Sequence, residues 1–338
     1  MGGSAEAQTA EVRGILVRDF RLQIAMIHRW RALLEERARD WNLAAGGSWS
    51  FLLFNNYYPQ SANIILHWFR NGGKFPQVVA KLCTEESVLK REFQSLTYVY
   101  SRASMSVPRP LDLVKQGKYV GLWMEGVPGL CSLLPDHRLS RLQSVVEMLA
   151  SVHGRVRNGG SGVGLERHRR MVLDPLVTVE QLGSAHAVLK GCAELRRRIS
   201  TEWLDSLPVI PQHGDLFPGN LLVHNERWHV VDWESFGVVD FPFYDLLTLL
   251  VSLVTADGEK LERWDEDMVR QVPGLIECYA QKLGLNAESV SLLLPLTLAN
   301  WIHLQWCDGR KKFTDRMYQT FEHYFEHPDR WQQVFRCA

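Results

Sequence analysis

The stretch that decides how this chain folds is His213-Gly214-Asp215-Leu216-Phe217-Pro218-Gly219-Asn220, which Val231-Asp232-Trp233-Glu234 soon follows. Two β-type runs lie between these segments, at 221–223 and 229–231. The polar stretch that separates the runs has the length of a hairpin connection, so we expect two short antiparallel strands. Because a hairpin brings its outer ends to one edge, Asn220 and Asp232 are predicted to lie close together.

These side chains have the chemistry that phosphoryl transfer requires. The reaction needs a group that orients the attacking oxygen, and it needs carboxylate or amide oxygens that hold Mg²⁺ on the phosphates of a nucleotide. Mg²⁺ takes oxygen ligands and usually accepts only one or two from the protein. We therefore predict that Asn220 and Asp232 share one Mg²⁺ ion, with Asp215 beside an activated hydroxyl. The alternative is an ordinary turn, because Asp after Gly in such a loop is a common turn former.

The order H-G-D-x-x-x-x-N, V-D-W-E and Y-D-L resembles the catalytic core of the aminoglycoside phosphotransferase and choline kinase superfamily, which is related to the protein kinases. The resemblance implies that Asp215 is the catalytic base and that His213 braces the loop. It also implies that Asn220 and Asp232 are the metal ligands.

Two further acids, Asp240 and Asp245, come after the V-D-W-E segment. By the same resemblance, Asp245 is a buried acid at a helix start that accepts amide hydrogen bonds from the loop. The segment from Asp240 to Asp245 has one residue more between its acids than the usual D-P-x-x-D. Helix capping or turn formation therefore explains Asp240 as well as a function does.

An N-terminal lobe must then supply a cation for the phosphates. The β-type run over 77–82 contains Lys81 and is close to the V-A-I-K pattern of kinase strands. A helical stretch that opens at Lys90 carries Glu92, which could pair with Lys81. A lysine held by a carboxylate presents its ammonium group to the α- and β-phosphates in a fixed direction. By themselves, however, the two residues would be a solvated surface pair.

The loop that covers the phosphates should lie between strands at 49–54 and 63–69. This loop contains no glycine, whereas protein kinases use glycine there so that backbone amides can approach the phosphates. Relatives in the phosphotransferase superfamily tolerate a less glycine-rich turn, often with Ser and Asn. Ser61 and Asn63 are therefore the predicted nucleotide contacts in this loop.

A hinge between the lobes should carry the adenine. The apolar run over 119–125 is typical of a buried strand, and the glycines and proline of 126–129 end it. The resemblance implies that backbone groups of Met124, Glu125 and Gly126 form hydrogen bonds with the adenine edge. The next apolar pattern, over 139–152, predicts an amphipathic helix closed by His153-Gly154, to which we assign only a core role.

The resemblance implies an α+β, two-lobed, protein-kinase-like fold with a small antiparallel-sheet N-lobe and a larger, mainly helical C-lobe. We place an amphipathic helical extension at 1–45, the nucleotide-binding N-lobe at 46–126, and the catalytic and substrate-binding C-lobe at 127–338. The extension is predicted to pack on the outer face of the N-lobe. A homodimer formed through this N-terminal helix is the alternative.

Composition narrows the class of protein. The 38 basic and 38 acidic residues give no net attraction to nucleic acid or to anionic membranes, so we expect neither partner. The six cysteines form no C-x-x-C pair, which argues against a zinc ribbon and a disulfide framework. The sequence shows neither a signal-peptide pattern nor an apolar stretch of membrane-spanning length. We therefore expect a cytoplasmic protein with reduced thiols.

Periodicity predicts helices over about 262–335, and the resemblance implies that the acceptor binds among these C-terminal helices. Aromatic residues at helical spacing are more often core than pocket. Exposed rings with nearby acids such as Asp308 or Glu322 would suit a sugar, an amino sugar or a quaternary amine. Charge-rich stretches at 166–170 and 196–198 are interpreted as solvated helix faces.

These observations predict a Mg²⁺-dependent kinase that transfers the γ-phosphate of ATP or GTP to a hydroxyl of a small metabolite, such as an aminoglycoside, a sugar or an amino alcohol. One alternative is a catalytically silent nucleotide-binding or regulatory member of the same fold. Another is a zinc enzyme, because the segment from His323 to His327 matches H-x-x-E-H. Pro328 and the short remaining chain weaken that second alternative.

Overall fold

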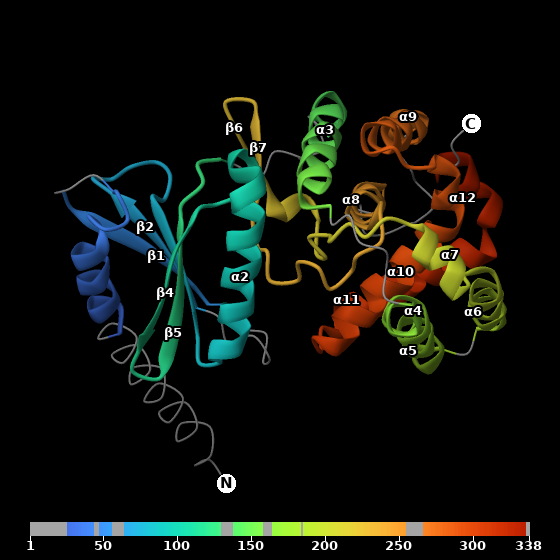
Figure 1. Ribbon diagram of the computed structural model, residues 1–338, viewed down its shortest axis with the longest axis horizontal. Helices are drawn as coiled ribbons and strands as arrows, with labels where there is room; N and C mark the ends of the chain where they lie inside the picture. The colour runs from blue at the N-terminus through green and yellow to red at the C-terminus, as the bar shows by residue number, and fades with distance from the viewer. Residues whose placement is uncertain are drawn as a thin grey trace, which may run out of the picture.

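The computed structural model describes residues 26–43, 47–55, 64–129, 138–157, 164–183, 185–254 and 266–335. The chain forms a sheet-containing N-lobe and a mainly helical C-lobe, which lie side by side in Figure 1. The predicted α+β, two-lobed architecture is therefore confirmed. Within the described ranges, no helix combines the length and the hydropathy that a membrane span requires.

The N-lobe is built on one antiparallel sheet with the strand order β1-β2-β3-β5-β4. Successive side chains of a strand point to opposite faces, so near-continuous apolar runs such as residues 119–124 suit a sheet that is covered on both faces. Helix α2 crosses over between β3 and β4 in the chain. The bounds are β1 Trp49–Asn55, β2 Ile64–Arg70, β3 Val78–Cys83, α2 Glu86–Ala103, β4 Pro110–Gln116 and β5 Tyr119–Glu125.

The two faces of this sheet carry different side chains: one carries Lys81, and the other carries buried tryptophans. Register pairs Ile65 with Lys81 and Lys81 with Leu122, so these three side chains share one face. The opposite face carries Trp68 and Trp123, both fully buried. In Figure 1, α2 lies on one side of the sheet and the helix of residues 26–37 lies on the other. The lysine face is thus directed toward α2 and the C-lobe.

The helix at 26–37 seals the tryptophan face. Its Trp30 and Leu34 are 1% and 0% exposed, and the Trp30 ring lies 5.7 Å from that of Trp123. At Gly121 an added Cβ would lie 2.8 Å from the Trp30 ring, so this strand position is closed to larger residues. The described part of the predicted extension therefore packs on the N-lobe. Residues 1–25 lie outside the described residues.

The C-lobe packs helices around a hairpin and two buried helices. Helix α8 is buried at all but one of its positions, and α10 is buried along most of its length, so both run through the core. The hairpin strands are β6 Leu221–His224 and β7 Arg227–Val230. The helices are α3 Arg138–Val156, α4 Gly164–His168, α5 Asp174–Leu182, α6 His186–Arg198, α7 Thr201–Ser206, α8 Tyr244–Val254, α9 Glu266–Leu283, α10 Val290–Cys307, α11 Lys311–Glu326 and α12 Pro328–Phe335.

Three local expectations are corrected. The hairpin turn has two residues, Asn225 and Glu226, both with positive φ, where we expected a four-residue connection. This is the type I′ geometry that matches the twist of paired strands. Helix α3 does not close at His153 but continues to Val156. Within the 166–170 stretch, Arg167 is 1% exposed rather than solvated, because its guanidinium donates to Asp240 Oδ1 and to Leu204 O inside the lobe.

The H-x-x-E-H segment has a structural role. His323 Nδ1 accepts the indole hydrogen of Trp331 at 3.0 Å, which ties α11 to α12. Helix α11 ends at Glu326 and Pro328 begins the next helix. No group of three or more His, Cys, Asp or Glu residues within the described ranges is arranged to hold a metal ion. The described residues therefore give the zinc alternative no support.

Candidate active site

The β6–β7 hairpin holds the two predicted metal ligands at one end. Leu221 pairs with Val230, and the amide of Val231 donates to the carbonyl oxygen of Asn220 at 3.0 Å. Asn220 thus enters the hairpin where Asp232 leaves it, as the hairpin argument requires. The side-chain amide of Asn220 donates to the carbonyl oxygen of Asp215 at 2.9 Å, which connects the hairpin to the loop.

Asp232 has an unusual backbone. Its φ is +68°, in the left-handed region that few side chains other than Asp and Asn tolerate well. Burial opposes the ionised form of its carboxyl group, but the ammonium of Lys81 outweighs that effect and lowers the pKa of Asp232. The carboxylate is therefore kept charged in a strained turn. Strain of this kind is found at functional sites, where the surrounding structure over-determines the backbone.

His213 braces the loop that carries Asp215. Its Nε2 lies 2.9 Å from the carbonyl oxygen of Val231, and its Nδ1 lies 3.4 Å from the amide nitrogen of Asp215. These contacts fit the tautomer in which Nε2 carries the hydrogen and Nδ1 accepts one. The ring also meets that of Trp233 edge to face, with centroids 4.7 Å apart. The imidazole thereby links the loop to the strand end next to Asp232.

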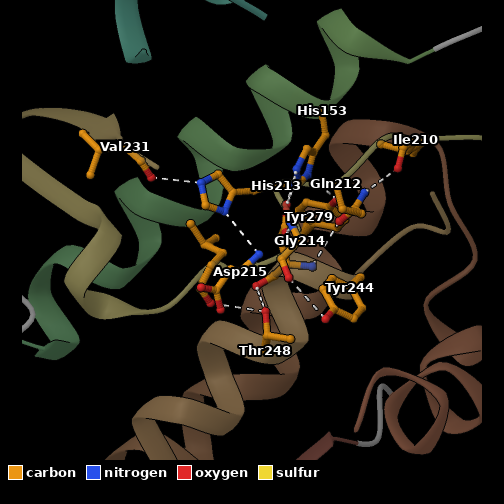
Figure 2. A network of polar contacts seen from close by, with 12 residues as sticks. His153, Ile210, Gln212, His213, Gly214, Asp215, Val231, Tyr244, Thr248 and Tyr279 are labelled. Carbon is orange, nitrogen blue, oxygen red and sulfur yellow. Dashed lines mark hydrogen bonds and ion pairs between the residues drawn. The ribbon is translucent and has the colours of Figure 1, made fainter. Parts of the chain in front are cut away.

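A buried polar network connects the loop at His213 and Gly214 with His153 and Tyr279 (Figure 2). Asp245 lies at its centre. Its carboxylate accepts the amide hydrogens of His213 at 2.6 Å and Gly214 at 3.0 Å. It also lies 3.0 Å from His153 Nε2, and His153 Nδ1 lies 2.7 Å from the Tyr279 hydroxyl. Sequence reasoning assigned His153 only to the core, because a histidine on an apolar helix face carries no local signal of its partner.

The pKa of Asp245 reflects this network. Burial alone would raise it, but the hydrogen bond and charge of His153 and the amide of His213 outweigh burial and lower it. The carboxylate sits in the first turn of α8, where helix amides also favour a negative charge. The loop is therefore anchored to a helix start by an ionised group that is 0% exposed.

Lys81 reaches from the sheet to three carboxylates. Its Nζ lies 3.0 Å from Glu92 Oε2, 3.1 Å from Asp232 Oδ1 and 2.7 Å from Glu234 Oε2. Lys81 and Glu92 are 6% and 2% exposed, so this is not a solvated surface pair. Burial by itself would lower the pKa of Lys81, but the carboxylates, Glu92 foremost, raise it well above its usual value. The N-lobe cation is thereby joined to the hairpin of the C-lobe.

The sequence predicted a role for Glu92 but none for Glu234. Burial raises the pKa of Glu92 to about 7 despite the attraction of Lys81. Glu234, two positions after Asp232, is the last residue of the V-D-W-E motif, and its sequence position predicts no role for it. Its contact with Lys81 depends on how the two lobes meet, which no local pattern encodes.

Asp215 lies at the edge of this cluster. Burial raises the pKa of its carboxyl group to about 6, although the Arg310 guanidinium and His213 oppose that shift. A base with a pKa in this range is ionised at neutral pH and still attracts a proton strongly enough to be useful.

Arg310 is a further residue that sequence reasoning missed. Its guanidinium lies 3.6 Å from Asp215 Oδ2, 3.6 Å from Glu234 Oε1 and 3.7 Å from Asp308 Oδ2. Asp308 was predicted as an acid near the acceptor, and this contact brings it beside Asp215 through Arg310. No motif marks Arg310, since it follows α10 far along the chain from the loop.

The lysine face of the sheet also forms an apolar wall. Register places Leu52, His67, Val79 and Met124 in one row across β1, β2, β3 and β5, on the face that carries Lys81. Leu52 is 54% exposed, and burial lowers the pKa of His67. A flat row of this kind beside a lysine is suited to an aromatic base.

The hinge differs in part from its prediction. The amide of Glu125 donates to Arg109 O and that of Gly126 donates to Gln77 O, both at 2.8 Å. These two N–H groups are therefore engaged within the protein and are not donors for an adenine. An added Cβ at Gly126 would lie 2.1 Å from Pro76 O, so only glycine fits where the strand leaves the sheet.

Several other predicted residues lie away from this cluster. Asp240 Oδ1 accepts from Arg167 Nε at 2.8 Å, which gives it a structural role inside the C-lobe. Ser61 and Asn63 lie outside the described residues. Most C-terminal aromatic rings, such as Trp301 and Trp331, are core, whereas Trp306 is 45% exposed.

Solved structures of kinases share this fold. An amicoumacin kinase, hAmiN, in complex with AMP-PNP, Ca²⁺ and Ami matches with a TM-score of 0.54 and 14% identity over 80% of this chain and 87% of that one. The apo form of a thermostable mutant of the aminoglycoside phosphotransferase APH(4)-Ia matches with a TM-score of 0.54 and 16% identity, over 82% of this chain and 94% of that one. The aminoglycoside phosphotransferase APH(3'')-Id from Streptomyces rimosus matches with a TM-score of 0.52 and 16% identity, over 80% of this chain and 97% of that one. At these identities the likeness shows the fold.

Sequence comparison identifies the family. No curated protein matches this chain. The sequence profile described as "Phosphotransferase enzyme family" matches residues 66–273, which include Lys81, the His213 loop and Asp245. The prediction of a phosphotransferase is confirmed. Because the match spans more than half of the chain, this protein belongs to the phosphotransferase enzyme family.

Proposed function

We propose that this protein is a Mg²⁺-dependent kinase that transfers the γ-phosphate of ATP or GTP to a hydroxyl group of a small metabolite. The observation that carries the proposal is the junction of Lys81 with Asp232 and Glu234, at 3.1 and 2.7 Å. It brings a buried cation from the sheet to the carboxylates that follow the hairpin. A nucleotide held there would have its phosphates next to Asp215.

The metal would be held by Asn220 and Asp232. Their carboxamide and carboxylate oxygens are the donors that Mg²⁺ prefers, and the β6–β7 hairpin keeps them at one end. Two protein ligands do not complete a coordination shell, so phosphate oxygens and waters would have to supply the others. When bound, the ion would neutralise phosphate charge during transfer.

The protein's own residues would do the remaining work. Asp215 would accept a hydrogen bond from the acceptor hydroxyl and take its proton. Lys81, fixed by Glu92, would hold the phosphates, and the row of Leu52, Val79 and Met124 would contact the base. His213 and Asp245 would act by holding the Asp215 loop.

The proposal is tested by nucleotide consumption. The purified chain would be given Mg²⁺ with ATP or GTP and panels of aminoglycosides, sugars, amino alcohols and nucleosides, and products would be detected by mass. Asp215→Asn should lower turnover by about two or more orders of magnitude while nucleotide affinity is largely retained. Unchanged turnover in this variant would remove Asp215 from the role of base.

The same screen distinguishes an active kinase from the alternative, a catalytically silent member of the fold. A silent member would bind Mg²⁺ and nucleotide but phosphorylate no compound of a broad panel. The intact set of Lys81, Glu92, Asp215, Asn220 and Asp232 argues for turnover. The acceptor is proposed only as a hydroxyl compound of small size.

A further inference from the structure

Arg310 occupies a central position between the catalytic loop and the N-lobe cation. Its Nη1 lies 3.6 Å from Asp215 Oδ2, and its Nη2 lies 3.6 Å from Glu234 Oε1. Glu234 in turn contacts Lys81 through its other oxygen, at 2.7 Å. A chain of alternating charges thus runs from Lys81 through Glu234 and Arg310 to Asp215.

The backbone holds Arg310 in a defined place. The α10–α11 turn includes Gly309 with φ +69°, and the Arg310 amide donates to Gln305 O at 2.9 Å. The Arg310 carbonyl oxygen accepts from the amide of Thr314 at 3.0 Å, which starts α11. Its Nη1 also lies 3.4 Å from Oε1 of Gln305, a side chain that is 3% exposed. The guanidinium, which is 24% exposed, is therefore presented from two helices rather than from a mobile surface arm.

The contacts of Arg310 with carboxylates are long. Charge-assisted hydrogen bonds from a guanidinium to an anion are about 2.7–2.9 Å. The three distances to Asp215, Glu234 and Asp308 lie between 3.6 and 3.7 Å. A small shift would let the guanidinium exchange these ion pairs for shorter bonds to an anion placed among them.

We propose that Arg310 binds the phosphoryl group while it is transferred and neutralises the charge on its oxygens. The inference rests on the proposed kinase function. In that reaction the acceptor oxygen forms a bond to the γ-phosphorus, and the bond from this phosphorus to the β–γ bridging oxygen breaks. The nucleoside diphosphate leaves with the bonding electron pair, and the hydroxyl proton passes to Asp215.

The position of Arg310 fits this step. The attacking oxygen must lie at Asp215, and the leaving phosphate must lie near Lys81, so the phosphoryl group crosses the space between them. Arg310 borders both ends through Asp215 and Glu234. Charge spreads over the equatorial oxygens in the transition state, so a guanidinium there contributes more to the transition state than to nucleotide binding.

The test uses a mimic of the transferred group and does not require the acceptor. Binding of Mg²⁺-ADP is measured calorimetrically with and without aluminium fluoride, which takes the place of the phosphoryl group in flight. The wild-type chain should bind Mg²⁺-ADP more tightly when aluminium fluoride is present. In Arg310→Ala, the increase in affinity that aluminium fluoride causes should be smaller by about 100-fold or more than in the wild type. The affinity of this variant for Mg²⁺-ADP alone should be little changed. Arg310→Lys should recover part of the gain, and millimolar guanidinium should recover part of it for Arg310→Ala.

Arg197→Ala is the matched control, because Arg197 is 73% exposed and pairs with Glu194 on its own helix. This variant should behave as the wild type, and thermal unfolding should show that all variants are folded. An aluminium fluoride gain that survives in Arg310→Ala, or that is absent from a wild-type chain which binds Mg²⁺-ADP, overturns the role of Arg310. A wild-type chain that does not bind Mg²⁺-ADP at all instead overturns the proposed kinase function.

Discussion

Asp245 Oδ2 accepts the amide hydrogen of His213 at 2.6 Å, so the first turn of α8 holds the loop that presents Asp215. The second carboxylate oxygen accepts from Gly214 at 3.0 Å. Two adjacent amides of the loop thus end on one ionised group. Movement of α8 would therefore displace Asp215 directly.

Asp245→Asn should destabilise the protein and slow turnover. In place of the carboxylate, the side-chain NH₂ group of Asn would face one of the two backbone N–H groups or His153. One hydrogen bond to the loop or to His153 would then be replaced by a contact between two donors. We expect a loss of about 2–4 kcal/mol in the free energy of unfolding, because a buried charged network would be broken. Urea denaturation measures this loss. Asp40→Asn, whose carboxylate is 64% exposed, is the control and should be near neutral.

The same pair predicts a pH dependence. The folded pKa of Asp245 lies below its unfolded value, because His153 and the loop amides outweigh burial. The ionised group therefore stabilises the fold above an unfolded pKa of about 4, and this contribution is lost as the pH falls through the lower folded value. The stabilities of wild type and Asp245→Asn should converge in acid. A difference that stays constant from pH 7 downward would contradict this account.

Asp215→Asn should stabilise the fold while it removes activity. The pKa of Asp215 is raised to about 6 by burial, so folding favours its protonated form. That contribution is fully present below an unfolded pKa of about 4 and is lost as the pH rises through about 6. At pH 8 the uncharged amide should gain about 1–3 kcal/mol over the wild type, and at pH 4 little. Thermal unfolding at both pH values checks the sign, and a variant that is less stable at pH 8 would refute it.

Lys81→Met should leave three acids without their common cation. Glu92 is 2% exposed, and burial already raises its pKa to about 7 with Lys81 present. We expect a loss of about 3–5 kcal/mol in stability. Lys81→Met with Glu92→Gln should regain part of this loss but not the nucleotide affinity. Equal stability of the single and double variants would show that the pair is not coupled.

Substitutions of Asp232 should separate backbone from ligand effects. Asp232→Ala places a residue with little tolerance for a φ of +68°, at a cost of about 1–2 kcal/mol, whereas Asp232→Asn suits that backbone. Both variants should lose Mg²⁺-dependent nucleotide binding. Titration of nucleotide with and without Mg²⁺ measures this, and retained dependence in Asp232→Ala would refute the ligand assignment.

Local segments of this protein were predictable from local patterns. The strand at Tyr119–Glu125 was predicted at its observed bounds, and the strand with Lys81 was displaced by one residue. The pairing of Asn220 with the end of β7 followed from the two apolar runs and the polar residues between them, although the turn itself is shorter than expected. Strand alternation and turn residues act over a few positions, so the chain itself carries that information.

The sequence by itself determined the order of the motifs, from which resemblance predicted the two-lobed fold and the loop of Asp215, and it offered Glu92 as a partner for Lys81. Only the tertiary structure decided that Glu234 meets Lys81, that His153 supports Asp245, and that Arg310 reaches Asp215. These contacts join segments that lie far apart in the chain. They depend on how buried faces pack and which charges that packing shields from water, and neither has a periodic signature in the sequence.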